Sequence, residues 1–291
     1  MIAPASASRA ALVGVAVLCG LFALPAVAQD SCDLKLQSAV GERRLVTVEA
    51  TVDATITAVD LEEKASTRSV ASQRKESFVE ETVVVDDQKE PVQVRLNCLI
   101  STVEERAAGE VSGGVRKTPV QGRIVTVTRE GTGWAVIPLE AEPLTADLAA
   151  PLGRWLDLRL LLKGGTVKIG ESWTVSGAER LAAMAVGKDA GVPEIRCTLG
   201  RIVPGNPAKA EVAVTVRMEK GKEGDENRMQ GQLAGLLVID LASGRPQSFS
   251  LSGSFRVNSA ARDANNAVVG RVEIQARQVV LKFAFEPAGK P

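Results

Sequence analysis

The chain of 291 residues contains no histidine and no tyrosine. Without histidine it has no Ser-His-Asp or Cys-His nucleophile system, no imidazole ligand for zinc or iron, and no side chain that ordinarily titrates near neutral pH. Asp and Glu are the main acid-base groups that remain. We therefore expect no catalytic residue of the familiar hydrolases, no metal site and no cofactor.

Aromatic residues are scarce, with 3 Trp and 6 Phe in the whole chain. They are too few to build the stacking platforms on which sugars and single-stranded nucleic acids sit. Neither sign of charge is in excess, because the chain has 35 Lys and Arg and 35 Asp and Glu. A balanced chain has no basic face for a polyanion, so we expect no nucleic-acid partner.

The one long apolar run lies at the N-terminus. Arg9 precedes an uncharged, mostly apolar stretch from Ala10 to Leu24, and a small-x-small triplet ends at Ala28. This is the order of regions in a secretory signal peptide, and the run is shorter than the roughly 20 residues of a transmembrane helix. We expect cleavage after Ala28, a secreted or periplasmic mature protein, and no transmembrane span in that mature chain.

Alternation of apolar and polar residues is the strongest signal in the rest of the chain. Every even position from Val46 to Ala58 is apolar, and similar patterns occupy residues 92–100, 208–218 and 249–257. Such alternation predicts strands with one buried and one wet face. Turn residues at 204–207 and 242–245 predict hairpins. The apolar phase switches at Arg277-Gln278, which predicts a β-bulge.

Two segments have helical spacing instead. In the first, apolar residues recur at three- and four-residue steps: Leu148, Leu152, Trp155, Leu156 and Leu162. Pro151 and Gly153 make the start of this segment irregular. The second segment begins with a capping box formed by Ser176 and Glu179 and ends at Gly187. Both are expected to be short helices.

Together these elements predict a mostly β fold. Antiparallel strands form a sandwich or an open half-barrel, with one or two short helices between two strand-rich halves. After the signal peptide at 1–28 we expect an N-terminal β half at 29–140, a helical connector at 141–165 and a C-terminal β half at 166–288. The two halves can also form one continuous domain.

Three cysteines of the mature chain share the phase of neighbouring apolar residues: Cys32, Cys98 and Cys197. We expect them to point inward. In an oxidising compartment two buried thiols that meet usually pair, so these are candidates for a structural disulfide, although the sequence does not say which two pair. A reactive role is disfavoured because the chain has no C-x-x-C and no histidine base, and apolar surroundings raise the pKa of a thiol.

A leucine run from Leu158 to Leu162 leads into the sequence V-K-I-G-E-S-W-T-V at 167–175. This segment resembles a motif of exported bacterial β-rich proteins of unknown function, in which a leucine run precedes V-K-[IV]-G-[ED]-S-W. The resemblance implies an envelope β protein and no particular chemistry. Within the motif, Gly170 predicts a turn or bulge, Glu171 a local hydrogen bond and Trp173 a core position.

Three functions remain open. The first, which we favour, is a non-catalytic interaction or structural module of the cell envelope whose inner faces pack as a closed core against each other. The second is a carrier of lipid or another apolar ligand, held on the inner sheet face or in a cleft under the helix at 148–162. Long strands with one apolar face and a helical segment are similar, as a fold analogy, to half-barrel carriers that shield acyl chains.

The third is a carboxylate-dependent hydrolase, with Glu80-Glu81, Asp86-Asp87 and Glu171 as candidates. Adjacent residues of a strand face opposite ways, so neither doublet is by itself a catalytic pair. The expected partner is therefore an unknown envelope protein or an apolar ligand.

Overall fold

The computed structural model describes residues 30–107, 114–131, 133–139, 143–149, 152–175, 193–222, 225, 227–263, 265 and 267–288. The predicted signal peptide and the predicted helix at 176–187 lie outside these residues.

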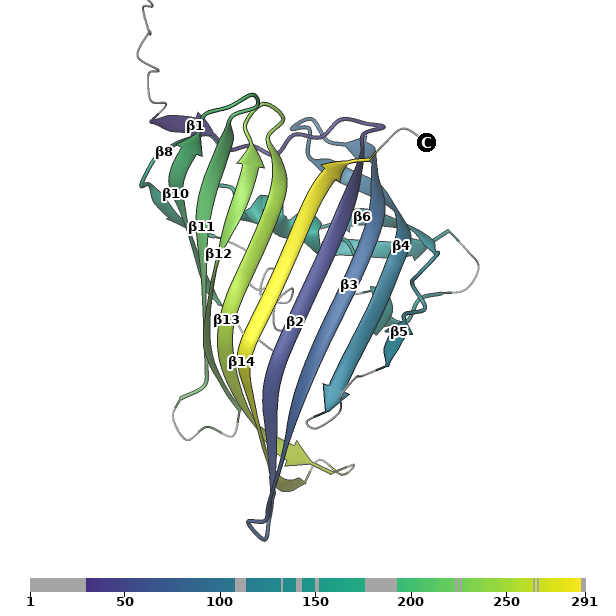
Figure 1. Cartoon of the computed structure of the whole chain (residues 1–291), viewed down its shortest axis with the longest axis vertical. Helices are drawn as coiled ribbons and strands as arrows, with labels where there is room; N and C mark the ends of the chain where they lie inside the picture. The colour runs from purple at the N-terminus through teal and green to yellow at the C-terminus, as the bar shows by residue number, and fades with distance from the viewer. Residues whose placement is uncertain are drawn as a thin grey trace, which may run out of the picture.

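Long strands make up most of the described chain (Figure 1). The first seven strands are β1 (Ser31–Asp33), β2 (Arg43–Asp60), β3 (Ala65–Val85), β4 (Pro91–Ala107), β5 (Val115–Lys117), β6 (Ile124–Glu130) and β7 (Gly133–Pro138). The helical elements are α1 (Ala146–Ala149) and the 3-10 helix η1 (Arg154–Leu161). The remaining strands are β8 (Thr166–Lys168), β9 (Ser172–Thr174), β10 (Glu194–Val203), β11 (Lys209–Lys220), β12 (Arg228–Asp240), β13 (Arg245–Arg262) and β14 (Val268–Pro287).

Twelve strands form one antiparallel sheet in the order β7-β6-β4-β3-β2-β14-β13-β12-β11-β10-β9, with β5 paired to β4. A second sheet consists of β1 and β8. Within the described part of the chain, the end strands β7 and β9 do not pair with each other, so the large sheet stays open. The predicted mostly β fold with an open antiparallel half-barrel is confirmed.

The registers follow from the alternating pattern. Val46 on β2 lies opposite Phe78 on β3 and Phe285 on β14, and all three are buried. The turns at 204–207 and 242–245 join β10 to β11 and β12 to β13 as hairpins, as predicted. The register between β14 and β2 shifts between Ala276 and Gln278, which confirms the predicted bulge.

The centre of the sheet joins the two ends of the described chain. β2, the first long strand, pairs along its whole length with β14, the last one. Residues from both predicted strand-rich halves therefore belong to one continuous sheet.

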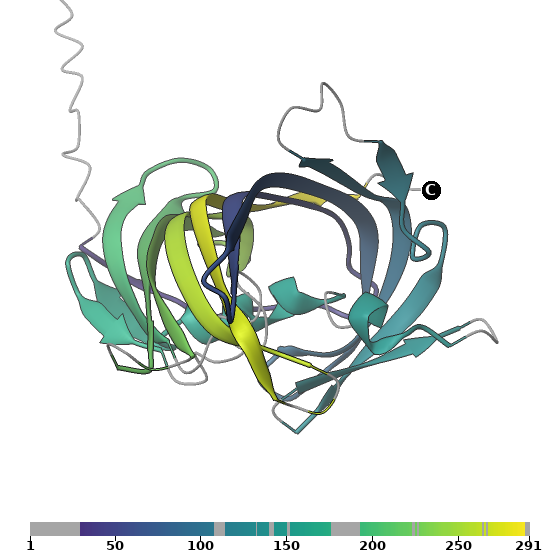
Figure 2. The same cartoon turned by 90° about the horizontal axis from the view of Figure 1, so that it is seen from below.

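The sheet bends around the segment that carries α1 and η1, which lies on its concave side (Figure 2). Close strand contacts accompany this curvature in β12 and β13. A Cβ at Gly235 would lie 1.7 Å from the carbonyl oxygen of Ser250, and a Cβ at Gly253 would lie 2.1 Å from that of Gln232. Only glycine permits strands to approach this closely, so these two positions shape the sheet.

The predicted helix at 148–162 is split in the structure. α1 ends at Ala149, and η1 begins after Gly153, whose φ of 73° lies in the left-handed region. A Cβ at Gly153 would lie 3.0 Å from a methyl carbon of Val127, so this glycine also lets the segment approach the sheet. The irregular start predicted at Gly153 is confirmed in the form of this break, whereas Pro151 lies outside the described residues.

Candidate functional site

The inner face of the sheet is the face that contacts η1. The rings of Trp155 on η1 and Phe78 on β3 have centroids 5.0 Å apart. Trp155 Nε1 donates a hydrogen bond of 2.5 Å to Glu80 Oε2, and Arg44 Nε donates one of 2.7 Å to Glu80 Oε1. Buried Glu80 is thus paired with Arg44 and oriented by the indole, so each of its oxygens has a structural partner.

The upper end of this face, where β2 begins and β14 ends, is covered by η1. Four side chains of η1 are buried against the core: Trp155, Leu156, Leu158 and Leu161. Polar contacts hold η1 in place at its edges. Glu90 Oε2 accepts hydrogen bonds from Arg129 on β6 at 3.0 Å and from Arg159 on η1 at 2.7 Å. We call this region the closed half.

A pocket of about 550 Å³ remains beside the C-terminal end of η1, between Leu36, Glu90, Arg159 and Leu162. Two of the charged side chains in its wall, Glu90 and Arg159, already bind each other. The space expected under the predicted helix is otherwise occupied by the buried side chains of η1.

Towards the turns that join β2 to β3 and β13 to β14, the inner face is less covered. Six apolar side chains of the inner phase are only half-buried there, and we call them the inner strip: Ala50, Val52, Ile56, Phe255, Val257 and Ile274. Ile56, Ile274 and Val257 lie side by side on β2, β14 and β13. These three residues form one half-buried apolar row on the concave side of the sheet, and buried Ala54 lies between this row and Val52 on β2.

Charged residues border the inner strip on β3. Arg74 lies directly opposite Ala50 of the strip. Its NH2 group donates a hydrogen bond of 2.6 Å to Glu76 Oε1, which also accepts from Ser101 Oγ at 3.2 Å. Burial lowers the pKa of Arg154, the first residue of η1, and the positive charge of Arg74 lowers it further. Arg74 and Glu76 thus form an ion pair, and both exert an electrostatic effect on Arg154.

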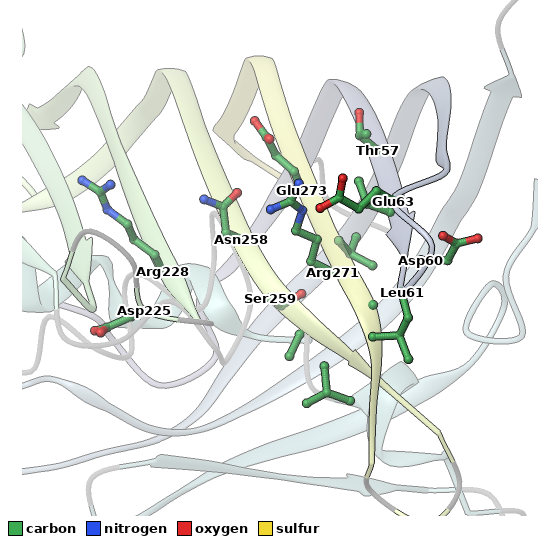
Figure 3. Close-up of a pocket in the computed structure, with 15 residues that line it drawn as sticks. Thr57, Asp60, Leu61, Glu63, Asp225, Arg228, Asn258, Ser259, Arg271 and Glu273 are labelled. Carbon is green, nitrogen blue, oxygen red and sulfur yellow. The ribbon is translucent and has the colours of Figure 1, made fainter.

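The opposite face of the sheet carries a second candidate, a pocket of about 860 Å³ near the β2–β3 and β13–β14 turns (Figure 3). One row of paired residues crosses its floor on four neighbouring strands: Thr57, Glu273, Asn258 and Arg228. Asp60, Leu61 and Glu63 of the β2–β3 turn lie along one side (Figure 3). The pocket thus has charges of both signs, unlike the apolar inner strip.

Several polar groups of this pocket have partners outside it. Asp60 Oδ1 accepts hydrogen bonds of 2.9 Å from the backbone N–H groups of Glu62 and Lys64, which fixes the turn. Glu273 Oε1 lies 3.1 Å from Arg256 Nε. These contacts are typical of a turn and of a cross-strand pair, so the pocket is a weaker candidate than the inner strip for a ligand site.

The three described cysteines are buried free thiols, and no disulfide joins them. Cys32 lies on β1, Cys98 on β4 and Cys197 on β10. Burial raises the pKa of Cys98 to about 12, with Glu76 adding to the rise, and burial raises the pKa of Cys197 to about 12. Burial also raises the pKa of Cys32. The predicted inward orientation is confirmed, and raised pKa values make these thiols poor nucleophiles.

The motif at 167–175 forms a structural corner. Gly170 has a φ of 83° in the turn between β8 and β9. Glu171 Oε2 accepts a hydrogen bond of 3.0 Å from the backbone N–H of Lys168, and its other oxygen pairs with Lys163. Trp173 is half-buried, packs on the core and donates from Nε1 to the carbonyl of Leu161 at 3.0 Å. The motif thus ties β9 to the end of η1.

The carboxylate candidates are not gathered into a pair. Glu80 faces η1, whereas Glu81 lies on the other face, 3.7 Å from Arg95. Asp86 binds Arg129 and the backbone of its own turn. The sequence pattern did not single out Arg74 and Arg154, and the one usable signal for β3 was the absence of Gly and Pro from residues 65–85.

Among the described residues, no cluster of three or more Cys, Asp or Glu could hold a metal ion. No helix in the described ranges combines the length and the apolarity that a membrane crossing requires.

No family model matches the chain, and no curated protein matches it in sequence. The solved structures that are similar to it include the following two. One is lipovitellin, in a structure concerned with lipid-protein interactions, with a TM-score of 0.44, 11% identity and coverage of 87% of this chain. This chain spans only 26% of that lipovitellin chain. The other is a LolA superfamily protein from Nitrosomonas europaea, with a TM-score of 0.16, 8% identity and coverage of 84% of this chain and 87% of that one. Both TM-scores are too low for these likenesses to carry an argument.

Proposed function

We propose that the protein is an exported, non-catalytic carrier that holds an apolar ligand on the inner strip of its open half-barrel. The observation that carries this proposal is the partial exposure of Ala50, Val52, Ile56, Phe255, Val257 and Ile274 on a concave face. Apolar surface in contact with water is costly, and exposed apolar patches mark sites where an apolar partner binds.

Export rests on the predicted signal peptide at 1–28. The motif at 167–175 supports grouping the protein with exported bacterial β-rich proteins that have the same sequence pattern. The absence of catalysis is a proposal too. It is supported by the separation of the carboxylates: Glu80 is bound by Arg44 and Trp155, and Glu81 lies on the opposite face of the sheet.

A purely structural or interaction module of the envelope is the second candidate, and the closed half favours it. There the inner face packs against η1 and needs no ligand. The two candidates differ in what occupies the inner strip, so the ligand content of the protein distinguishes them.

The test is native mass spectrometry of the protein purified from its own cells without detergent, followed by organic extraction. The carrier proposal predicts a stoichiometric apolar adduct. The substitution Ile56→Glu introduces an ionised group into the strip and should abolish the adduct, since transfer of a charge into an apolar contact is strongly unfavourable.

Thr55→Glu is the matched control because Thr55 is the neighbour of Ile56 on the other face of β2. It should retain the adduct. A wild-type mass without adduct, together with no uptake of added oleate or monooleoylglycerol, would overturn the carrier proposal in favour of the interaction module.

A further inference from the structure

The half-buried row formed by Ile56, Ile274 and Val257, here called the Ile56 row, runs across the strands rather than along them. Its residues are cross-strand partners on β2, β14 and β13, which are neighbours in the sheet. Neighbouring strands lie about 4.8 Å apart, so the row is about 10 Å long between its outer residues. An elongated apolar ligand would therefore cover the whole row only if it lies perpendicular to the strands.

The Ile56 row ends on both sides at residues of a different kind. On β3, the cross-strand partner of Ile56 is Arg68, which is charged and exposed. On β12, the partner of Val257 is Met229, which is only 4% exposed and belongs to the core. The apolar surface that a ligand can reach thus ends at a charged side chain on β3 and at the packed core on β12.

Towards the closed half, little apolar surface continues the row. The next residues of the inner phase on β2 and β14 are Ala54 and Ala276, and both are buried. Their neighbour on β13 is Phe255, which is half-buried and lies two residues from Val257. Phe255 therefore widens the Ile56 row at one end and does not lengthen it across the strands.

Towards the turns, the next cross-strand row consists of Ala58, Val272 and Ser259. These side chains are smaller than those of the Ile56 row, and one of them carries a hydroxyl group. An apolar chain lying there would bury less apolar area and would meet a polar group at one end. The Ile56 row is thus the more favourable position for an apolar chain.

The length of the row corresponds to a limited number of carbon atoms. Bonds of about 1.5 Å at tetrahedral angles advance an extended alkyl chain by about 1.3 Å per carbon, so about eight carbons cover about 10 Å. Building on the proposed function, we infer that the Ile56 row binds an apolar chain of medium length, with about eight to ten carbons in contact. The polar end of the ligand lies in solvent beside Arg68, since the row ends in the core at Met229. Further carbons extend into water and add no affinity.

The experiment measures how affinity depends on chain length. The full chain, freed of bound ligand, is titrated calorimetrically with alkyl maltosides whose chains range from about 6 to about 14 carbons, each below its critical micelle concentration. The head group is constant, so only the apolar contact varies along the series. Each added methylene within the row should raise the affinity by about two- to fourfold, and this gain should vanish beyond about ten carbons.

A variant with a longer row tests where the chain lies. Arg68→Leu extends the row by one strand, which is about 4.8 Å or roughly four carbons. Its affinity should match that of the wild-type protein up to about ten carbons and should continue to rise up to about fourteen. Arg271→Leu is the matched control, because it makes the same substitution at an exposed residue on the other face of β14. It should leave the dependence on chain length unchanged.

The outcomes separate this inference from the proposed function. A wild-type affinity that keeps rising to the longest chain would overturn the medium chain length and leave the carrier function standing, and this result depends on no variant. Failure of every chain length to bind would overturn the carrier function itself. If Arg68→Leu kept the wild-type limit of about ten carbons, the placement of the chain on the Ile56 row would be wrong.

Discussion

Val46 at the upper end of β2 is fully buried, whereas Val52 on the same strand and the same face is half-buried. The two valines occupy equivalent positions in one alternating pattern. They differ in their surroundings, because Val46 lies opposite Phe78, whose ring contacts Trp155 of η1, whereas Val52 lies opposite Ser72. Alternation thus determines which face a side chain occupies, while burial depends on a covering element encoded elsewhere in the chain.

The charged residues of β3 show the same contrast. Glu80 in the closed half is buried and held by Arg44 and Trp155. Arg74 on the same face borders the inner strip and is partly exposed. A charged side chain in the closed half contacts η1, and one next to the inner strip is partly exposed to solvent.

The largest loss of stability is expected from removal of the Trp155 side chain, which connects η1 to the sheet. Trp155→Ala should lower the free energy of unfolding by about 3–5 kcal/mol, because it leaves a cavity against Phe78 and removes a hydrogen bond from Glu80. Equilibrium unfolding in urea measures this loss. Trp155→Phe retains an aromatic ring and should cost about 1–2 kcal/mol, the contribution of the indole hydrogen bond. Equal losses for the two variants would contradict the packing role of the ring.

A direct test of the contrast along β2 compares Val46→Ala with Val52→Ala. The first change should cost about 2 kcal/mol and the second less than about 1 kcal/mol, since only the first removes fully buried methyl groups. Both values come from the same urea titrations, with ligand removed beforehand. If Val52→Ala cost as much as Val46→Ala, the inner strip would be part of a closed core.

The smallest loss of stability is expected from a change in the ion pairs at the edge of η1. Asp86→Asn should lower the free energy of unfolding by about 1 kcal/mol at neutral pH, since it removes one charge from the pair with Arg129. Burial acts to raise the pKa of Asp86, but hydrogen bonds from Arg129 and from the backbone of Glu90 and Gln88 bring it below the ordinary value of 3.8.

A lowered pKa in the folded state contributes stability above the unfolded value and loses it as pH falls through the folded value. The difference between wild-type protein and Asp86→Asn should therefore narrow as the pH falls below 3.8, which thermal unfolding over a pH series would detect. A difference that stays constant down to strongly acidic pH would show that the charge of Asp86 is not the cause.

The sequence predicted most of the sheet because apolar residues alternate strictly in β2, β11 and β13. It even located the bulge at Ala276–Gln278, since the phase of apolar residues changes there. β3 was missed because its inner face carries Arg74, Glu76 and Glu80, which interrupt the apolar pattern on which strand prediction depends. The structure shows why these charges are tolerated, since each has a charged partner on the same face.

The candidate site was only partly predictable. The sequence indicated an apolar inner face and a helical segment near it, but not where coverage by that segment ends. The contact between Trp155 and Glu80 joins residues 75 positions apart, and a single sequence contains no signal for such a pairing. The break at Gly153 depends on its close approach to Val127, which is a property of the folded chain.

The pairing of β2 with β14 also determines when during synthesis the sheet can be completed. The strands at the centre of the sheet are the first and the last long strands of the described chain, so the central contacts are the most distant in its sequence. Contacts of this kind slow folding. Until β14 is available, β2 presents a long unpaired edge, and such edges associate with other chains. A nascent chain of this topology therefore benefits from being kept unfolded until its last strand has emerged.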